Sequence, residues 1–241
     1  MLLADFDLDG LKDIHVTNGI NRDIRNNDFA NEFQRRIDSG ESLNLLDMAS
    51  EAPSTLLSNF TYSNQGELSF DKVGDDWGLG EPSFSYGAAH GDIDGDGDLD
   101  LIVSNNNMPP FVYQNNSTGN WIEIAVNGSN KNSNGLGCKV AVFQNGEKQF
   151  AEITNTRGYQ SSSQPIAHFG LPSASQVDSL VVFFPDGKVA KQTGVKANQR
   201  LTIDQKTSGN QGYNVYGSIK PIFSEYSSQL GISFKHEEND F

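Results

Sequence analysis

The sequence predicts an all-β protein in which a partial β-propeller is followed by a small β-sandwich-like domain. Three observations predict this class. Short β-branched runs alternate with Asn, Gly and Ser turns, while helical periodicity is scarce. A nine-residue acidic motif occurs twice with matching flanks, which indicates a structural repeat. The later part of the chain lacks this motif and has the alternating pattern of hairpin strands.

The acidic motif has the form D-x-D-x-D-G-x-x-D and occupies residues 5–13 and 92–100. Alternating aspartates in a tight turn supply the oxygen ligands that Ca²⁺ prefers, and glycine at position 6 permits the turn. We expect each loop to bind calcium through its carboxylates and the backbone carbonyl of position 7. The predicted ligands are Asp5, Asp7, Asp9, Leu11 and Asp13 in the first loop, and Asp92, Asp94, Asp96, Asp98 and Asp100 in the second.

A solvated acidic turn without a metal is the alternative interpretation, because Asp and Gly favour turns by themselves. Four or five carboxylates within nine residues repel one another unless a cation lies among them, so two matching copies favour calcium. An EF-hand does not fit. Position 12, which is Glu in that motif, is Val16 in one copy and Val103 in the other, and strands flank the loops.

Two further echoes define the predicted repeat. The sequence F-T-Y-S-N at 60–64 is echoed by F-V-Y-Q-N at 111–115. The pattern F-x-x-V-x-x-x-W-G-L at 70–79 is echoed by F-x-x-Y-x-x-x-L-G-I at 223–232. Four short strands in a recurring unit are typical of a β-propeller blade. We expect the strands of one such unit near residues 60–64, 68–73, 85–90 and 101–104.

The repeat region, residues 1–118, is interrupted by a helical insertion at about 21–58. Asp28 is the expected N-cap of a first helix and Gly40 its expected end. We expect a packing element that covers a blade edge, and an inserted functional element is the alternative. The apolar residues at roughly helical spacing are Ile24, Phe29, Phe33, Ile37, Leu43, Leu46 and Met48.

A separate all-β domain is predicted for residues 119–205, and its length of roughly 85 residues is normal for a sandwich. Residues 206–221 are rich in Ser, Gly, Asn and Gln and predict a linker. Residues 222–241 read as the truncated start of a further repeat. Since the chain also opens at the last elements of a unit, we expect it to be a piece of a longer protein. The expected strands are 121–126, 137–143, 148–154, 177–184, 188–192 and 199–204.

Composition narrows the classes of partner. The net charge of −14 disfavours nucleic acids and anionic membranes. No apolar run is long enough to span a bilayer, so we expect no membrane insertion of this segment, and no signal peptide is visible. The lone cysteine, Cys138, is expected to be a small buried hydrophobe and leaves the compartment open.

On these residues the chain resembles known families. The acidic units are similar to the FG-GAP/VCBS repeat, the blade repeat of integrin-like propellers. Residues 120–204 resemble the ASPIC/UnbV domain, with Phe183-Phe184 where a Trp is expected before Pro185. Repeats followed by this domain resemble the cartilage acidic protein 1-like family, bacterial surface type. The carrying motifs are 134–137 (N-G-L-G), 156–161 (T-R-G-Y-Q-S), 168–171 (H-F-G-L), 177–180 (V-D-S-L) and 184–187 (F-P-D-G).

We expect no catalytic site. The four histidines lie in different elements without metal-ligand spacing, and no nucleophile or phosphate-loop motif is present. His90 precedes the second calcium loop by two residues and either supports its ligands or has a structural role. His168 is expected to be buried and hydrogen-bonded, packed against Arg157 and Tyr159, and a ligand contact is the alternative. Glu123 and Glu152 form an acid–base pair only in an alternative interpretation; alternation predicts solvent-facing side chains. His15 is expected in a strand, and His236 is left unassigned.

The resemblance implies an extracellular or cell-surface calcium-binding repeat protein, with an unknown protein or glycan as its ligand in adhesion. Two alternatives remain at this point. One is a polysaccharide-processing enzyme that uses the propeller as a scaffold, because fold alone does not exclude catalysis. The other is a structural spacer of a large surface protein.

Overall fold

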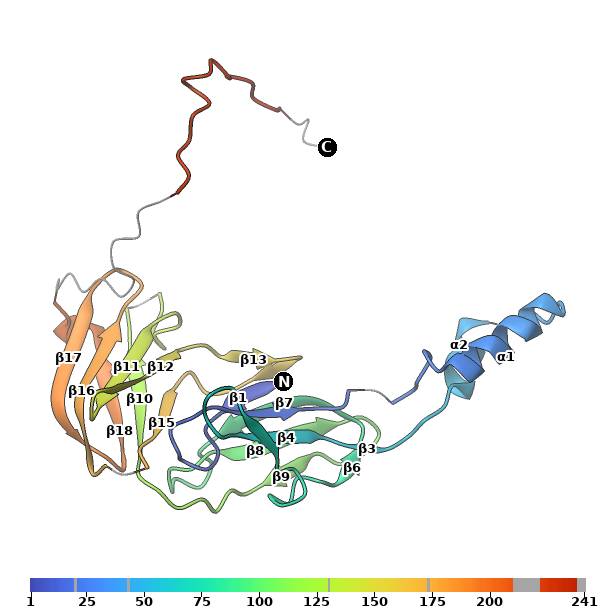
Figure 1. The fold of residues 1–241 in the computed structure, drawn as a ribbon, viewed down its shortest axis with the longest axis horizontal. Helices are drawn as coiled ribbons and strands as arrows, with labels where there is room; N and C mark the ends of the chain where they lie inside the picture. Colours follow the sequence, from blue (N-terminus) through green and yellow to red (C-terminus); the bar gives the residue numbers. More distant parts are fainter. Residues whose placement is uncertain (20, 43, 130, 173, 210–221, 238–241) are drawn as a thin grey trace.

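The computed structural model describes residues 1–19, 21–42, 44–129, 131–172, 174–209 and 222–237. It is mostly β-strand with few helices, which confirms the all-β class (Figure 1). Two small sheets lie next to a group of strands that share a larger core. A pair of helices stands to one side, and the described C-terminal segment lies apart from the rest in the same view.

The two small sheets, here called the sheet pair, contain the acidic loops. The first has the order β1-β2-β4-β5 and the second the order β7-β8-β9, with neighbouring strands antiparallel. A short β3-β6 ladder joins their ends. The strands are β1 (Leu2–Ala4), β2 (Asp13–Val16), β3 (Leu57–Ser58), β4 (Phe60–Asn64), β5 (Phe70–Lys72), β6 (Pro82–Ser83), β7 (Ser85–Gly91), β8 (Asp100–Asn105) and β9 (Phe111–Tyr113).

The predicted blade unit is wrong in its phase. Strand β4 pairs back with β2, across the helical insertion, and β7 begins a new sheet instead of joining β5. The reason is the turn after β5. It ends at Gly78, whose φ of +73° lets the chain reverse, and it carries Trp77 and Leu79 onto the core cluster that the two small sheets share. Within the described residues the sheets stay separate and do not close into a propeller.

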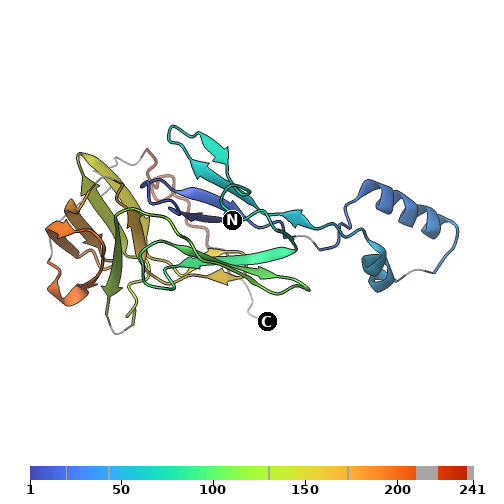
Figure 2. The same cartoon turned by 90° about the horizontal axis from the view of Figure 1, so that it is seen from below.

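The insertion forms helices α1 (Asn27–Asp38) and α2 (Leu45–Glu51) between β2 and β4, as predicted. Its predicted role as a cover for a blade edge is wrong. Helix α1 buries no residue, and both helices stand clear of the sheets in both views (Figures 1 and 2). Arg36 of α1 forms an ion pair with Glu51 of α2, which links the two helices.

The N-cap of α1 is also different from the prediction. The side chain of Asn26 accepts a hydrogen bond from the Phe29 amide at 3.1 Å, while Asp28 lies in the first turn, where its charge favours the helix dipole. Gly40 follows the end of the helix as expected, with a φ of +87°. Leu43, one of the predicted periodic residues, lies outside the described residues.

Strands β10 to β18, here called the sandwich, form two main sheets around one core. The orders are β15-β10-β18, in which β10 and β18 are parallel, and β12-β11-β16-β17. Ile122, Val140, Phe169 and Leu180 from both sheets meet in this core with Cys138, which is buried as predicted. The strands are β10 (Trp121–Asn127), β11 (Lys139–Gln144), β12 (Glu147–Glu152), β13 (Thr156–Gly158), β14 (Ser161–Ser162), β15 (Ala167–Gly170), β16 (Gln176–Phe183), β17 (Val189–Lys196) and β18 (Gln199–Asp204).

The sandwich continues into a short 3₁₀ helix, Gln205–Thr207, and Gly209 bridges back to Val189. The remainder of the predicted linker, residues 210–221, lies outside the described residues. The predicted start of a further repeat forms no strand between residues 222 and 237, where the structure has one turn and exposed apolar side chains.

Candidate metal centre

The first acidic loop, residues 5–13, connects the antiparallel strands β1 and β2. The Asp13 carboxylate accepts the Phe6 amide at 2.9 Å and the Asn64 amide at 3.0 Å, so it ties the loop to itself and to β4. Asp9 closes the turn by accepting the Leu11 amide at 2.7 Å. Gly10, at position 6, has a φ of +89°, which is the conformation the motif predicts for glycine.

The second loop, residues 92–100, repeats this scheme between β7 and β8. The Asp100 carboxylate accepts the Ile93 and Asn115 amides, both at 2.9 Å. The bond to Asn115 is the counterpart of the bond to Asn64 in the first loop. Gly97 has a φ of +99°. The sequence echo between residues 60–64 and 111–115 therefore has a physical basis. In each copy the backbone N–H of the final Asn donates to the last aspartate of the loop.

Three carboxylates gather in each loop. Asp5, Asp7 and Asp9 in the first loop, and Asp92, Asp94 and Asp100 in the second, each offer an oxygen within 4.8 Å of the others. Oxygens around Ca²⁺ lie roughly 2.3–2.6 Å from the ion, so this spacing fits one shared cation. Asp13 and Asp96 lie outside these groups. The peptide carbonyls of Leu11 and Asp98 stay predicted ligands.

Buried charge in the loops is poorly compensated. Asp5 is fully buried and its Oδ1 has no hydrogen-bond partner, and Asp98 is only 2% exposed with neither carboxylate oxygen bonded, among the described residues. Burial raises the pKa of Asp5 to about 6, with Asp9 adding to the rise and Lys12 opposing it. Burial and the neighbouring Asp96 raise the pKa of Asp98 to about 7. A cation would supply the missing counter-charge.

Both loops contact the sandwich, and the sequence did not predict this contact. Strand β15 reaches them with adjacent residues of one motif. His168 Nε2 lies 2.8 Å from the Gly97 carbonyl oxygen of the second loop, and the Gly170 amide donates to Asp5 Oδ2 of the first at 3.0 Å. Lys12, in the first loop, donates to the His168 carbonyl at 3.2 Å. The H-F-G-L motif therefore bridges the two loops.

Three glycines allow the acidic loops and the sandwich to lie this close together. A Cβ on Gly170 would lie 2.3 Å from Asp5 Oδ2 and 2.7 Å from the Leu8 backbone. One on Gly97 would overlap the Trp121 indole at 1.7 Å, and one on Gly10 would press on Gln149 at 3.1 Å. A second contact supports the same interface, where Ser161 and Ser163 accept the β7 amides of residues 88 and 90 at 3.0 and 3.2 Å.

The histidines have structural positions. His15 is buried in β2 with Nδ1 3.0 Å from Thr61 Oγ1, and His90 packs edge-on to Phe6. The prediction that His168 is buried and hydrogen-bonded is confirmed, but its bonded partner is the Gly97 carbonyl. Burial lowers the pKa of His15 and of His168 to about 4 and that of His90 to about 3. His236 lies in the exposed segment 222–237.

The remaining candidates do not form a catalytic group. Glu123 was expected to face solvent, which is wrong: it is buried in β10 and pairs with Arg200 at 2.6 Å. Glu152 is exposed on β12, in the other sheet of the sandwich. Arg157 donates to the Glu152 carbonyl at 3.1 Å, and Tyr159 is exposed. His168 is buried, whereas Tyr159 is exposed.

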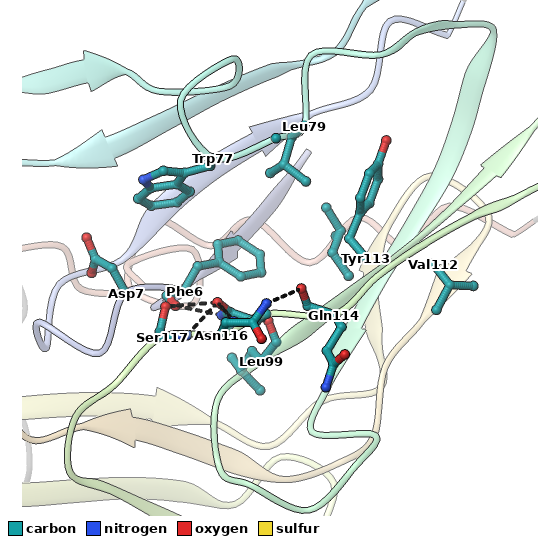
Figure 3. A pocket seen from close by; sticks show the side chains of 13 residues that line it. Phe6, Asp7, Trp77, Leu79, Leu99, Val112, Tyr113, Gln114, Asn116 and Ser117 are labelled. Carbon is teal, nitrogen blue, oxygen red and sulfur yellow. Dashed lines mark hydrogen bonds between the residues drawn. The ribbon is translucent and has the colours of Figure 1, made fainter.

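A cavity of about 500 Å³ opens in the sheet pair beside the first loop (Figure 3). Trp77 and Leu79 lie on one side of it, opposite the β9 end with Tyr113 and Gln114, and Phe6 forms its floor. Asn116, Ser117 and Asp7 add polar groups at the rim. Aromatic walls with a few polar groups are typical of ligand sites.

Comparison with known proteins identifies one domain. The family described as ASPIC and UnbV matches residues 128–210, which confirms that part of the resemblance; the FG-GAP/VCBS repeats stay a prediction. In the motif where a Trp was expected, Phe184 is buried in the sandwich core.

This chain is similar to cartilage acidic protein 1 from three animal species. The Mus musculus protein is 32% identical over 108 residues, 42% of this chain and 16% of that protein. The Xenopus tropicalis protein is 32% identical over 124 residues, 49% of this chain and 19% of that protein. The Homo sapiens protein is 31% identical over 119 residues, 47% of this chain and 18% of that protein. The chain spans less than a fifth of the length of these relatives. In the described residues no helix is long and apolar enough to cross a membrane.

Proposed function

We propose that this chain is a calcium-stabilised binding module of an extracellular or cell-surface protein. The observation that carries the proposal is a pair of buried aspartates, one in each acidic loop, with carboxylate oxygens that lack a hydrogen-bond partner in the described part of the chain: Oδ1 of Asp5 and both oxygens of Asp98. Carboxylates with a raised pKa and oxygens that no protein group bonds are the groups that a bound cation stabilises. An all-oxygen donor set in a flexible loop fits Ca²⁺ better than a transition metal.

Calcium has an architectural role in this proposal. It neutralises each loop, and the loops then present the Gly97 carbonyl to His168 and the Asp5 carboxylate to the Gly170 amide of β15. The similarity to cartilage acidic protein 1 and the ASPIC/UnbV domain support an extracellular setting, in which millimolar calcium is available to weak sites.

The ligand surface that we assign is the cavity between Trp77 and Tyr113, beside the first loop. Its aromatic walls and amide rim suit a glycan or an extended peptide. The burial of His168 and the exposure of Tyr159 give the enzyme alternative no support. The lack of enzymatic activity stays a prediction.

Replacing one loop aspartate should weaken one calcium site. We expect Asp7→Ala and Asp94→Ala each to lower the affinity of its own loop roughly tenfold or more, because each removes a charged ligand from a small donor set. The other loop should titrate as in the unchanged chain. Calorimetric calcium titration of metal-stripped protein measures both sites. Asp28→Ala, an equal charge change on the distant helix α1, is the control, and if all three variants titrate alike the ligand assignment is wrong.

The calcium effect should depend on pH. The folded pKa values of Asp5 and Asp98, about 6 and about 7, lie above the ordinary value, so without metal these groups hold protons until the pH rises through that range. Calcium must displace those protons. The rise in melting temperature on adding calcium should therefore be small at pH 5.5 and full at pH 8. Taking the difference between calcium and EDTA at each pH removes the opposite contribution of the buried histidines. An equal rise at both pH values would contradict this account.

A further inference from the structure

Strand β9 forms the edge of the second sheet, and the first sheet shows what such an edge accepts. We propose that residues Phe223–Glu225 of the same chain add a fourth strand to the β7-β8-β9 sheet. They would pair antiparallel with residues 113–115, at the end of β9 and just beyond it, in the register that β5 keeps with β4. The inference is independent of calcium binding and assigns a role to the segment 222–237.

The two sheets correspond strand by strand until this point. β1, β2 and β4 of the first sheet match β7, β8 and β9 of the second, with one acidic loop in each. The first sheet has a fourth strand, β5, whereas β9 pairs only with β8 among the described residues. After β9 the chain enters the sandwich, so the missing strand must come from elsewhere. An open edge is a ready template for a further strand.

The segment 223–232 repeats the sequence pattern of 70–79, which contains β5 and the turn after it. The turn repeats as well. Trp77, Gly78 and Leu79 donate backbone hydrogen bonds to residues 73, 75 and 74, with lengths of 2.8, 3.1 and 2.7 Å. Leu230, Gly231 and Ile232 donate to residues 226, 228 and 227, with lengths of 3.2, 3.3 and 2.9 Å. Gly78 and Gly231 have φ values of +73° and +68°.

This turn has two different environments in the two copies. Trp77 and Leu79 pack against the core cluster that includes Phe6 and Leu101. Leu230 and Ile232 are 66% and 59% exposed. The segment therefore keeps the turn of the first copy, while the apolar side chains of that turn are exposed. In the first copy the strand before the turn is paired with β4.

The register follows from the first sheet. There Asn64 lies opposite Phe70, Ser63 opposite Asp71 and Tyr62 opposite Lys72. The echo of 60–64 by 111–115 transfers these pairs to Asn115 with Phe223, Gln114 with Ser224 and Tyr113 with Glu225.

The length of the connection favours pairing within one chain. Thirteen residue steps separate Gly209 from Ile222, and they span up to about 45 Å when extended. The sheet pair and the sandwich together have about 170 residues, and a globular body of this size has a diameter of roughly 40 Å. The connection is therefore long enough to reach across it. A tether of this length gives an effective concentration in the millimolar range, which favours the chain's own segment over that of a second copy.

The test is a register-specific disulfide. We expect the full-length double variant Gln114→Cys with Ser224→Cys to form an intramolecular bond on mild oxidation, because directly opposed residues in a ladder have the required spacing. The control is Gln114→Cys with Glu225→Cys, a shift of one residue that places the second thiol on the other face. Cys138 does not compete, because it is buried. Non-reducing electrophoresis at two protein concentrations and mass spectrometry identify the product.

A concentration-independent monomeric crosslink in the first variant, strongly reduced in the second, supports the proposal. Three outcomes overturn it: no crosslink, equal crosslinking in both variants, or disulfide-linked dimers alone. Amide hydrogen exchange gives an independent readout without cysteines. The Gln114 and Ser224 amides should be protected in the unchanged chain. Ser224→Pro removes the N–H that would donate to the Gln114 carbonyl, and the resulting loss of strand pairing should abolish the protection of the Gln114 amide. Fast exchange of both amides in the unchanged chain would also overturn the proposal.

Discussion

Adding 2 mM calcium to metal-stripped protein should raise its melting temperature by about 10 °C. Extracellular calcium sites of this class have dissociation constants near 0.1 mM at their tighter end, on the order of 10⁻⁴ to 10⁻³ M. At about 2 mM calcium, such a site stabilises the folded chain by roughly 1.8 kcal/mol. Two sites then contribute about 3.6 kcal/mol, and in a protein of this size 1 kcal/mol corresponds to about 2–4 °C. Thermal melting followed by circular dichroism measures the shift.

Magnesium at the same concentration is the control for ionic strength and nonspecific charge screening. Mg²⁺ gives up its water reluctantly and demands octahedral geometry, so a flexible loop of aspartates should bind it more weakly than Ca²⁺. We therefore expect a much smaller shift with magnesium. Identical melting curves in EDTA and in 10 mM calcium would remove the calcium account altogether.

Gly97→Ala should undock the sandwich from the second loop and lower the melting temperature by about 10 °C. The added methyl would lie 1.7 Å from the Trp121 indole, so the two parts must separate or the loop must distort. Overpacking of this kind costs about 1–3 kcal/mol, to which the left-handed backbone adds roughly 1–2 kcal/mol. The change should also expose Trp121 and shift its fluorescence to longer wavelength.

Gly95→Ala is the matched control within the same loop. Gly95 has a φ of +84°, but its Cβ would meet no atom within 4 Å. It should therefore show only the backbone cost, about 1–2 kcal/mol, without a fluorescence shift. The double variant Gly97→Ala with Trp121→Ala should be less destabilised than the sum of its single changes, because the second substitution removes the clash. Equal effects of the two glycine variants would show that the indole contact does not hold the sandwich in place.

Local patterns in the sequence were sufficient for the acidic loops and most strands. The aspartate spacing predicted Gly10 and Gly97 at positive φ, and alternation predicted the strands around Cys138. Long-range features were missed. No local sequence pattern indicates that β4 pairs with β2 across an insertion of nearly forty residues. Likewise, the H-F-G-L motif identified a family, but its contacts with both loops depend on how two separately folded parts meet.

Errors at single residues have a similar cause. Alternation placed Glu123 on a solvent face, because a strand pattern does not show that Arg200 lies beside it in a parallel neighbour. The burial of Asp98 at position 7 was also missed, since only the assembled loop shows its side chain without a partner. The useful signal would have been a fifth aspartate where the motif needs only a carbonyl oxygen.

The most direct test of the central claim is a count of bound calcium. Metal-stripped protein is dialysed to equilibrium against buffer with millimolar calcium at pH 8, and the calcium and protein contents are then measured. We predict about two calcium ions per chain, a content lowered toward one in the Asp94→Ala variant, and an unchanged two in Asp28→Ala. A content near zero in the unchanged chain would contradict the assignment of the acidic loops as calcium sites.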